Sequence, residues 1–189
     1  MPIEWKCCRM QFSKVESILP KIKPKLVQYQ YIMRALHSVN TATDLDFQHR
    51  YNGFYRVQRR KPEFYAVYYG LLEKYKNQTV SFSDILQEIY NNTGRMEASF
   101  SSKMLSVIDP HYPVWDKYVL ENLGMKAPYT YDKNRMKKIL HIYQEIIDWY
   151  DYFLKTDEAI SVIEKFDRYY PDSGITSLKK IDFIIWQTR

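Results

Sequence analysis

The chain has 189 residues, a length that suits one domain or two small lobes around one core. It carries 28 basic and 22 acidic residues, a net charge of +6, and 46% of its residues are hydrophobic. This composition excludes an intrinsically disordered protein, because such chains lack the apolar residues that form a core. The positive net charge modestly favours a polyanionic partner such as nucleic acid.

The cysteines and histidines do not have the spacing of metal ligands. Cys7 and Cys8 are adjacent, and neighbouring side chains rarely converge on one metal ion. The histidines are scattered along the chain, at His37, His49, His111 and His141. We therefore expect no metal site and no cofactor, and we interpret both sets as structural or surface residues.

The N-terminal ten residues carry charges where a signal peptide has an apolar core. No apolar run approaches the length needed to span a membrane. We therefore expect a cytoplasmic protein with no membrane partner.

Helical periodicity without sustained strand-like alternation predicts an all-α fold of about eight helices. Residues 1–24 are expected to be irregular or briefly helical, because Pro20 and Pro24 should break a long helix. The helical segments that follow are predicted at residues 25–39, 44–55, 62–75, 83–91, 95–108, 116–123, 132–155 and 157–170, with a last helix from residue 177.

Capping residues give most of the predicted boundaries. Pro62 suits a first helical turn, and Gly94 suits a left-handed helix terminator. The predicted N-terminal caps are Ser83 or Asp84, Asp116, Asp132 for the longest helix, Thr156 or Asp157, and Ser177. We predict one all-α domain over residues 1–189, in which residues 25–124 and 125–189 could form two lobes that share one core.

Residues 50–70 interleave basic and aromatic side chains. Arginine and lysine can neutralise phosphates, and aromatic rings can stack on unpaired bases. The segment places the cations Arg56, Arg59, Arg60 and Lys61 among the rings of Tyr51, Phe54, Tyr55, Phe64 and Tyr65. The alternative is an amphipathic helix pair whose rings form core and whose cations face water, and helical spacing alone favours it.

Residues 99–124 combine a helical lysine, a rigid turn and a capping aspartate. Lys103 lies beside an apolar helix face, with Ser99 and Ser106 as helical neighbours. Residues 109–110, an Asp-Pro pair, end this helix, because a residue before proline avoids helical geometry. Asp116 then begins the next helix, where free backbone N–H groups favour a carboxylate.

A lysine amine beside a carboxylate suits nucleophilic displacement at a sugar C1′ carbon. The amine forms a Schiff base, and the carboxylate stabilises the developing positive charge. A free lysine is only about one part in a thousand neutral near neutral pH, so such a site must lower the lysine pKa by burial. The alternative is that Asp116 is only a helix cap and that Lys103 is a solvated residue or the surface partner of Asp116.

The order of Lys103, an apolar helix, a proline-containing turn and Trp115–Asp116 resembles the active-site region of the helix-hairpin-helix DNA glycosylases, especially their 8-oxoguanine-glycosylase-like bacterial relatives. The resemblance covers residues 99–124. It implies an all-α, two-lobed fold that flips a damaged base into a cleft. It also implies that Lys103 attacks C1′ and that Asp116 assists.

The same resemblance implies a helical hairpin that grips the DNA backbone. Residues 93–95 would form the hairpin turn, which gives Gly94 and Arg95 a DNA-binding role. Ser99 and Trp115 would line the substrate pocket. Residues 50–57 also resemble a segment that recurs in uncharacterised bacterial relatives.

We therefore predict a DNA base-excision glycosylase, with or without lyase activity, that acts on double-stranded DNA. One alternative is a non-catalytic helical nucleic-acid-binding protein that keeps the fold without the reaction. The other is a helical interaction protein whose tyrosine-rich surface binds another protein or a second copy of itself.

Overall fold

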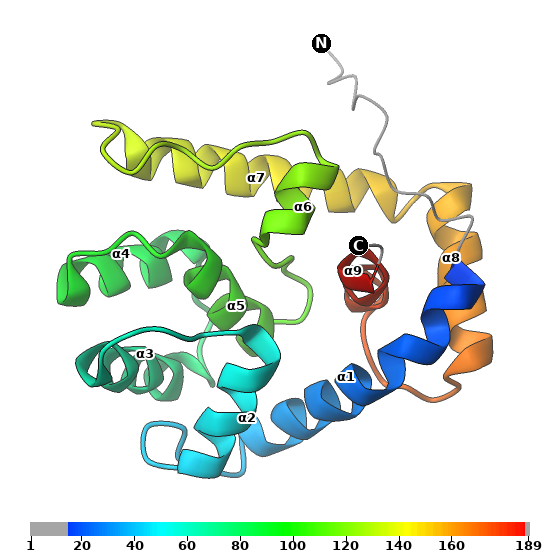
Figure 1. The fold of residues 1–189 in the computed structure, drawn as a ribbon, viewed down its shortest axis with the longest axis horizontal. Helices are drawn as coiled ribbons and strands as arrows, with labels where there is room; N and C mark the ends of the chain where they lie inside the picture. Colours follow the sequence, from blue (N-terminus) through cyan, green and yellow to red (C-terminus); the bar gives the residue numbers. More distant parts are fainter. Residues whose placement is uncertain (1–14, 188–189) are drawn as a thin grey trace. The chain divides into compact units, whose positions relative to one another are not determined.

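The computed structural model describes residues 15–187, and within this range it contains nine α-helices and no strand. The all-α prediction is confirmed, and these nine helices correspond to the nine predicted segments, against an expected total of about eight. The helices are α1 (Val15–Leu36), α2 (Leu45–Tyr55), α3 (Pro62–Tyr75), α4 (Phe82–Thr93), α5 (Ala98–Ile108), α6 (Lys117–Asn122), α7 (Arg135–Phe153), α8 (Asp157–Tyr169) and α9 (Ser177–Gln187) (Figure 1).

The chain divides into two compact units, which we describe separately. Within the described residues, unit 1 comprises residues 15–22 and 110–187, and unit 2 comprises residues 23–109. Unit 1 therefore holds the first turns of α1 together with α6 to α9, and unit 2 holds the rest of α1 with α2 to α5. The units are interleaved in the sequence, so a single cut after residue 124 does not separate them.

Helix α1 corrects the prediction for the N-terminal segment. It runs through Pro20 and Pro24 without a break, and both proline side chains are exposed. A proline inside a helix costs about 3 kcal/mol, because it removes a backbone donor and crowds the preceding turn. Here the burial of one continuous apolar face outweighs that cost. The buried residues of this face are Val15, Ile18, Leu19, Ile22, Leu26, Tyr29, Ile32 and Leu36.

The length of α1 also corrects a second prediction. With 22 residues it is the longest described helix, whereas α7 has 19. The N-cap of α7 is Asn134 and not Asp132, which instead accepts a hydrogen bond from the Asn134 N–H at 2.8 Å.

In unit 2, α3 contacts both α4 and α5, which pack against each other (Figure 1). The core of this unit is rich in aromatic rings. The Tyr68 hydroxyl donates to the Phe100 carbonyl at 2.9 Å and lies 2.9 Å from the Tyr51 hydroxyl. Because Tyr68 uses its proton on Phe100, Tyr51 is the donor in the second bond. This chain of hydrogen bonds joins α2, α3 and α5.

Two boundaries of the α4–α5 hairpin differ from the prediction. Ser81, rather than Ser83 or Asp84, caps α4, and its side chain and that of Asp84 bond reciprocally to each other's backbone N–H in a capping box. Helix α5 begins at Ala98 instead of residue 95. Gly94 ends α4 with a φ of 66°, as predicted, and residues 95–97 form the connection.

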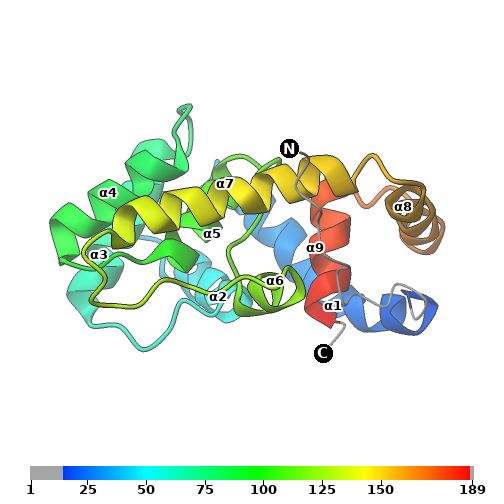
Figure 2. The ribbon, with the colours of Figure 1, turned by 90° about the horizontal axis from the view of Figure 1, so that it is seen from above.

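In unit 1, α9 is seen end-on in Figure 1 and crosses α7 in Figure 2. It also contacts α6 and α8. Its N-terminus is capped by Thr176, whose hydroxyl accepts from the Lys179 N–H at 3.2 Å, so the prediction of Ser177 as the cap is wrong by one residue. Thr156 caps α8, as predicted.

Within residues 15–187, no helix is long and apolar enough to cross a membrane. The same residues contain no group of His, Cys, Asp and Glu side chains that could hold a metal ion. Cys7 and Cys8 lie outside the described residues.

Candidate functional site

Helix α5, the second helix of the α4–α5 hairpin, carries the predicted nucleophile and is buried along almost its whole length. Its serine hydroxyls bond to carbonyls of the same segment. Ser101 donates to Glu97 and Ser102 to Ser99, both at 3.0 Å, and Ser106 donates to Lys103 at 3.2 Å. Small side chains that satisfy their own hydrogen bonds let other elements approach the helix closely.

Lys103 lies in the middle of α5, and only 7% of its surface is exposed. Its Nζ is 5.3 Å from the centre of the Phe100 ring, a distance typical of a cation–π contact. Lysines are almost never buried to this degree unless the ammonium is compensated. The alternative in which Lys103 is a solvated surface residue is therefore wrong.

Ser99 lies in the first turn of α5 and is partly exposed. It is four residues before Lys103, so the two share a helix face one turn apart. Its carbonyl accepts from the Ser102 hydroxyl. Among the predicted site residues of unit 2, Ser99 is therefore the one placed on the Lys103 face of the same helix.

The connection between α4 and α5 gathers two of the predicted DNA-binding cations. The Glu97 carboxylate, directly before α5, lies 3.0 Å from an Arg60 guanidinium nitrogen and 2.8 Å from Nε of Arg95. The Arg60 guanidinium also lies 5.0 Å from the Phe100 ring centre. Residues from two distant parts of the sequence thus meet on one surface of unit 2. Two cations on one carboxylate leave this group with one net positive charge.

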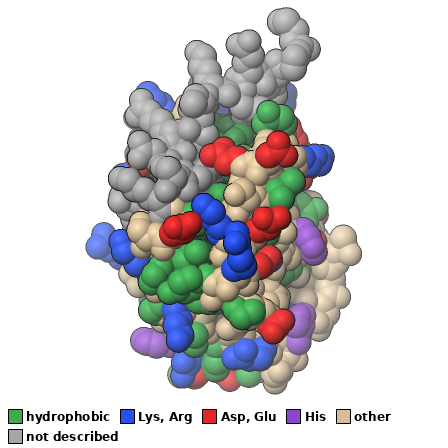
Figure 3. Space-filling view, turned by 90° about the vertical axis from the view of Figure 1, so that its right-hand side faces the viewer, with side chains coloured by type: hydrophobic (Ala, Val, Ile, Leu, Met, Phe, Trp, Pro, Cys, Tyr) green, Lys and Arg blue, Asp and Glu red, His purple; other side chains and the backbone are tan. Residues whose placement is uncertain are grey.

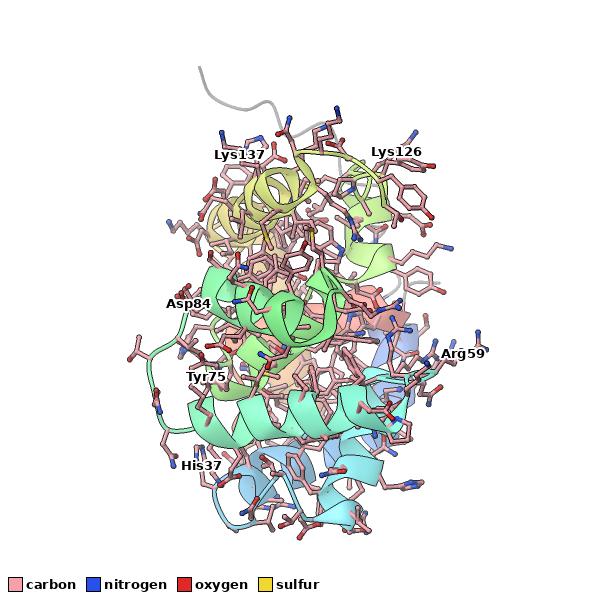
Figure 4. The ribbon with its side chains drawn as sticks, turned by 90° about the vertical axis from the view of Figure 1, so that its left-hand side faces the viewer. His37, Arg59, Tyr75, Asp84, Lys126 and Lys137 are labelled. Carbon is pink, nitrogen blue, oxygen red and sulfur yellow. The ribbon has the colours of Figure 1, made fainter. Side chains whose placement is uncertain are left out.

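The remaining predicted cations, Arg56, Arg59 and Lys61, are exposed. None of them forms an ion pair with the part of the chain that the structure describes. Arg56 and Arg59 have left-handed backbones, with φ of 54° and 60°, so the chain turns sharply between α2 and α3. Figure 4 shows the Arg59 side chain extending outward from this connection.

The aromatic residues of the 50–70 segment do not form a base-stacking surface. Tyr65 is partly exposed, and its hydroxyl bonds to the Val57 carbonyl at 3.2 Å. The other four rings, Tyr51, Phe54, Tyr55 and Phe64, are buried. They contact other aromatic rings in the core of unit 2. Residues 50–70 therefore form the amphipathic helix pair given above as the alternative, in which most rings are buried in the core and most cations face solvent.

In unit 1, Asp116 caps α6 as predicted. Its carboxylate accepts from the Tyr118 N–H at 2.9 Å. The partial positive charge at the start of a helix favours a carboxylate in this position. Trp115, the residue before it, is buried. Lys103 belongs to unit 2 and Asp116 to unit 1.

Unit 1 also contains a buried charged cluster that the sequence did not indicate. Nζ of Lys179 lies 2.9 Å from the Asp182 carboxylate, and neither side chain has any exposed surface. The Tyr150 hydroxyl donates to the other oxygen of the same carboxylate. The i,i+3 spacing of Lys179 and Asp182 was the available signal, but that spacing is more common in exposed pairs.

The sequence matches no protein-family model, and comparison with curated proteins and with solved structures gives no match either. The function is therefore argued from the side chains themselves. Two lysines of the described residues, Lys103 and Lys179, are buried, and the exposed arginines of unit 2 offer contacts for an anionic ligand.

Proposed function

We propose that the protein is a DNA glycosylase that removes a damaged base from double-stranded DNA. Lys103 is the nucleophile, and Asp116 is the carboxylate that assists it. The observation that carries this proposal is the burial of Lys103 on the second helix of a helical hairpin. Burial disfavours the charged form of a lysine, and the neutral amine is the form that attacks carbon.

The reaction consists of one displacement and one ring opening. The Lys103 amine forms a bond to C1′, and the bond from C1′ to the base nitrogen breaks, so the base leaves with the electron pair. Loss of the amine proton and opening of the sugar ring then give a Schiff base between Lys103 and the deoxyribose. The Asp116 carboxylate stabilises the positive charge that develops on the sugar in the transition state.

Backbone contacts from unit 2 would hold the DNA. Arg56, Arg59 and Lys61 are exposed beside the Arg60–Glu97–Arg95 group, so they can each pair with a phosphate. Glu97 limits the contribution of Arg60 and Arg95, because a phosphate must compete with this carboxylate for both guanidinium groups.

Borohydride trapping on a panel of duplexes with abasic sites or oxidised bases tests the proposal. Wild-type protein is expected to give a covalent protein–DNA adduct, and Lys103→Gln is expected to give none. Lys76→Gln is the matched control, because Lys76 is a largely buried lysine of the same unit that pairs with Glu73 at 2.8 Å. It should trap as well as wild type.

Two results would overturn the assignment. An adduct of Lys103→Gln at the wild-type level would exclude Lys103 as the nucleophile. The absence of any wild-type adduct, together with the absence of base release across the panel, would exclude glycosylase chemistry.

The exposed cations Arg56 and Arg59 favour a second function, non-catalytic DNA binding. In this case the protein would bind duplex DNA in a salt-dependent manner without turnover, and Arg56→Gln with Arg59→Gln would weaken binding and reduce its salt dependence. Base release by the wild-type protein would show that its function is not limited to DNA binding.

A further inference from the structure

The segment from residue 126 to residue 141, which leads into α7 and forms its first two turns, holds much of the positive charge of the chain. We call it the 126–141 surface. It has five basic residues and one acidic residue, Asp132, which gives a net +4 out of a net +6 for the whole chain. The basic residues are Lys126, Lys133, Arg135, Lys137 and Lys138, and Figure 4 shows Lys126 and Lys137 at the surface of unit 1.

Two tyrosine rings are exposed on the same surface. Tyr129 is 70% exposed and Tyr131 is 81% exposed, the latter more than any other large hydrophobic residue of the described chain. Their ring centres lie 5.5 Å apart in an edge-to-face arrangement. Each ring therefore keeps most of its surface open to solvent. This contrasts with residues 50–70, where the rings between the basic residues are mostly buried.

Hydrogen bonds order the turn that carries these rings. The Asp132 N–H donates to the Tyr129 carbonyl at 3.1 Å, which closes a turn around Tyr131. The Asp132 carboxylate then accepts from the Asn134 N–H and from the Lys138 ammonium. These bonds link the turn to the first turns of α7, and both tyrosine rings are exposed to solvent.

An open depression of about 380 Å³ lies next to this turn on α7. It is lined by Asn134, Lys137, Lys138 and His141. Lys138 pairs with Asp132 and His141 lies 3.8 Å from Glu145, whereas Lys137 has no acidic partner among the described residues and is available to an anionic group. The depression is therefore suited to a bulky anionic group.

We propose that the 126–141 surface binds single-stranded nucleic acid, with phosphates on the lysines and unpaired bases stacked on Tyr129 and Tyr131. Base–aromatic stacking and backbone neutralisation together characterise sequence-tolerant binding of single strands. The proposal depends on unit 1 alone. It goes beyond the glycosylase proposal and does not require that Lys103 reacts.

The chemistry of the exposed rings favours a nucleic acid over a membrane. A surface that inserts into lipid presents aliphatic side chains and tryptophan or phenylalanine. The only exposed large hydrophobic residues within residues 126–141 are Tyr129 and Tyr131. A single strand is favoured over a duplex because only unpaired bases offer free ring faces for stacking.

Elsewhere on unit 1 the charges are mixed. Helix α8 has acidic residues in excess of basic ones, and Figure 3 shows acidic and basic side chains interspersed on the face where α8 lies. Tyr152 on α7 is 57% exposed, but Asp148 lies one turn before it. Asp148, Asp151 and Lys155 all lie within about one turn of Tyr152, so this exposed tyrosine has no net positive surround, and Tyr152→Ala is a matched control.

Fluorescence anisotropy of the full chain with a labelled twelve-nucleotide thymidine strand, and with a duplex of the same length, tests the proposal. We expect the double variant Tyr129→Ala, Tyr131→Ala to bind the single strand at least about tenfold more weakly than wild type, given the usual contribution of a stacked base. Tyr152→Ala should bind as wild type does. Circular dichroism should be unchanged for both variants, because the substituted side chains are exposed.

A charge variant tests the second half of the proposal. Each lost phosphate contact to a single strand lowers the salt slope by about 0.7, so Lys133→Gln with Lys137→Gln should lower it by roughly 1.4. An unchanged affinity of the double tyrosine variant, or an unchanged slope of the double lysine variant, would overturn the proposal. Binding to vesicles rich in phosphatidylserine, with no binding of the single strand, would also overturn it. None of these binding measurements depends on the reactivity of Lys103, so the single-strand proposal and the glycosylase proposal can be contradicted independently.

Discussion

The protein buries two lysines in different ways, one in each unit. Lys179 in unit 1 has no exposed surface, and its ammonium contacts the Asp182 carboxylate, which also accepts from Tyr150. Lys103 in unit 2 keeps 7% of its surface exposed and lies over the Phe100 ring. Both are withdrawn from water, but only the Lys179 side chain is fully enclosed.

The difference separates a structural burial from a functional one. A carboxylate at hydrogen-bond distance inside the core favours the charged ammonium and fixes it in place. Lys179 is held in this way within α9, and the Tyr150 hydroxyl joins the pair to α7. Lys103 lies instead on the second helix of the α4–α5 hairpin, the position that the proposed reaction gives to the nucleophile. The comparison leads us to expect that Lys103 variants alter chemistry and Lys179 variants alter stability.

The largest expected effect is the loss of adduct formation in Lys103→Met. Methionine keeps the length and packing of the side chain and removes the ammonium from the interior. We therefore expect no trapped adduct, whereas the free energy of unfolding should stay large enough to keep the variant folded. Urea unfolding followed by circular dichroism measures the second quantity. A variant that unfolds and also fails to trap would contradict the functional role assigned to this burial.

Lys179→Met should lower the stability of the fold and leave adduct formation unchanged. It leaves the Asp182 carboxylate buried without its cation, and breaking a buried pair costs about 3–5 kcal/mol. Urea unfolding should show this loss, and trapping per folded molecule should be unchanged. The double variant Lys179→Met, Asp182→Leu should recover part of the loss, because no charge then stays unpaired. If Lys179→Met alone is as stable as wild type, the Lys179–Asp182 pair does not stabilise the packing of α9.

Asp116 offers a finer test because two substitutions separate its cap from its charge. Asparagine is as good an N-terminal cap as aspartate, whereas alanine costs about 1 kcal/mol. We expect Asp116→Asn to keep the free energy of unfolding and to slow adduct formation, and Asp116→Ala to lower both. Single-turnover trapping kinetics provide the rates. Equal adduct rates for wild type and Asp116→Asn would show that Asp116 acts only as a helix cap.

The smallest expected effect concerns Glu73, which pairs with the control lysine, Lys76. Burial raises the pKa of Glu73, but hydrogen bonds from Lys76 and Thr41 outweigh it and hold the pKa below the usual range. A carboxyl whose folded pKa is lowered adds stability above its unfolded pKa and loses it as the pH falls through the folded pKa. Between about pH 6 and about pH 3, wild type should therefore lose more stability than Glu73→Gln. Equal losses in urea titrations at the two pH values would contradict this assignment.

Local sequence signals predicted the fold where one residue determines a boundary. The first-turn Pro62, the terminator Gly94, and the caps Asp116 and Thr156 each act through their own backbone geometry or hydrogen bond. Residues 15–24 of α1 were not predicted to continue the helix at 25–39, because a proline inside a helix carries a large penalty. Residues 15, 18, 19, 22 and 26 follow a helical period through both prolines, and this pattern was visible in the sequence.

The candidate site was less predictable, because burial depends on residues distant in the sequence. Nothing near Lys103 distinguishes a buried lysine from a solvated one, since its burial depends on residues outside α5 that pack against this helix, such as those of α3 and α4. The same holds for Lys179 and Asp182, whose spacing is that of a surface pair. Basic and aromatic residues alternate both at 50–70 and at 126–141, yet the rings are mostly buried in the first segment and exposed in the second.

The most direct measurement is the position of the covalent bond itself. Wild-type protein trapped by borohydride on a duplex with a damaged base can be digested and mapped by mass spectrometry. The account predicts that the deoxyribose remnant is attached to Nζ of Lys103. Attachment to any other amine, whether the N-terminus, Lys76 or Lys179, would contradict it.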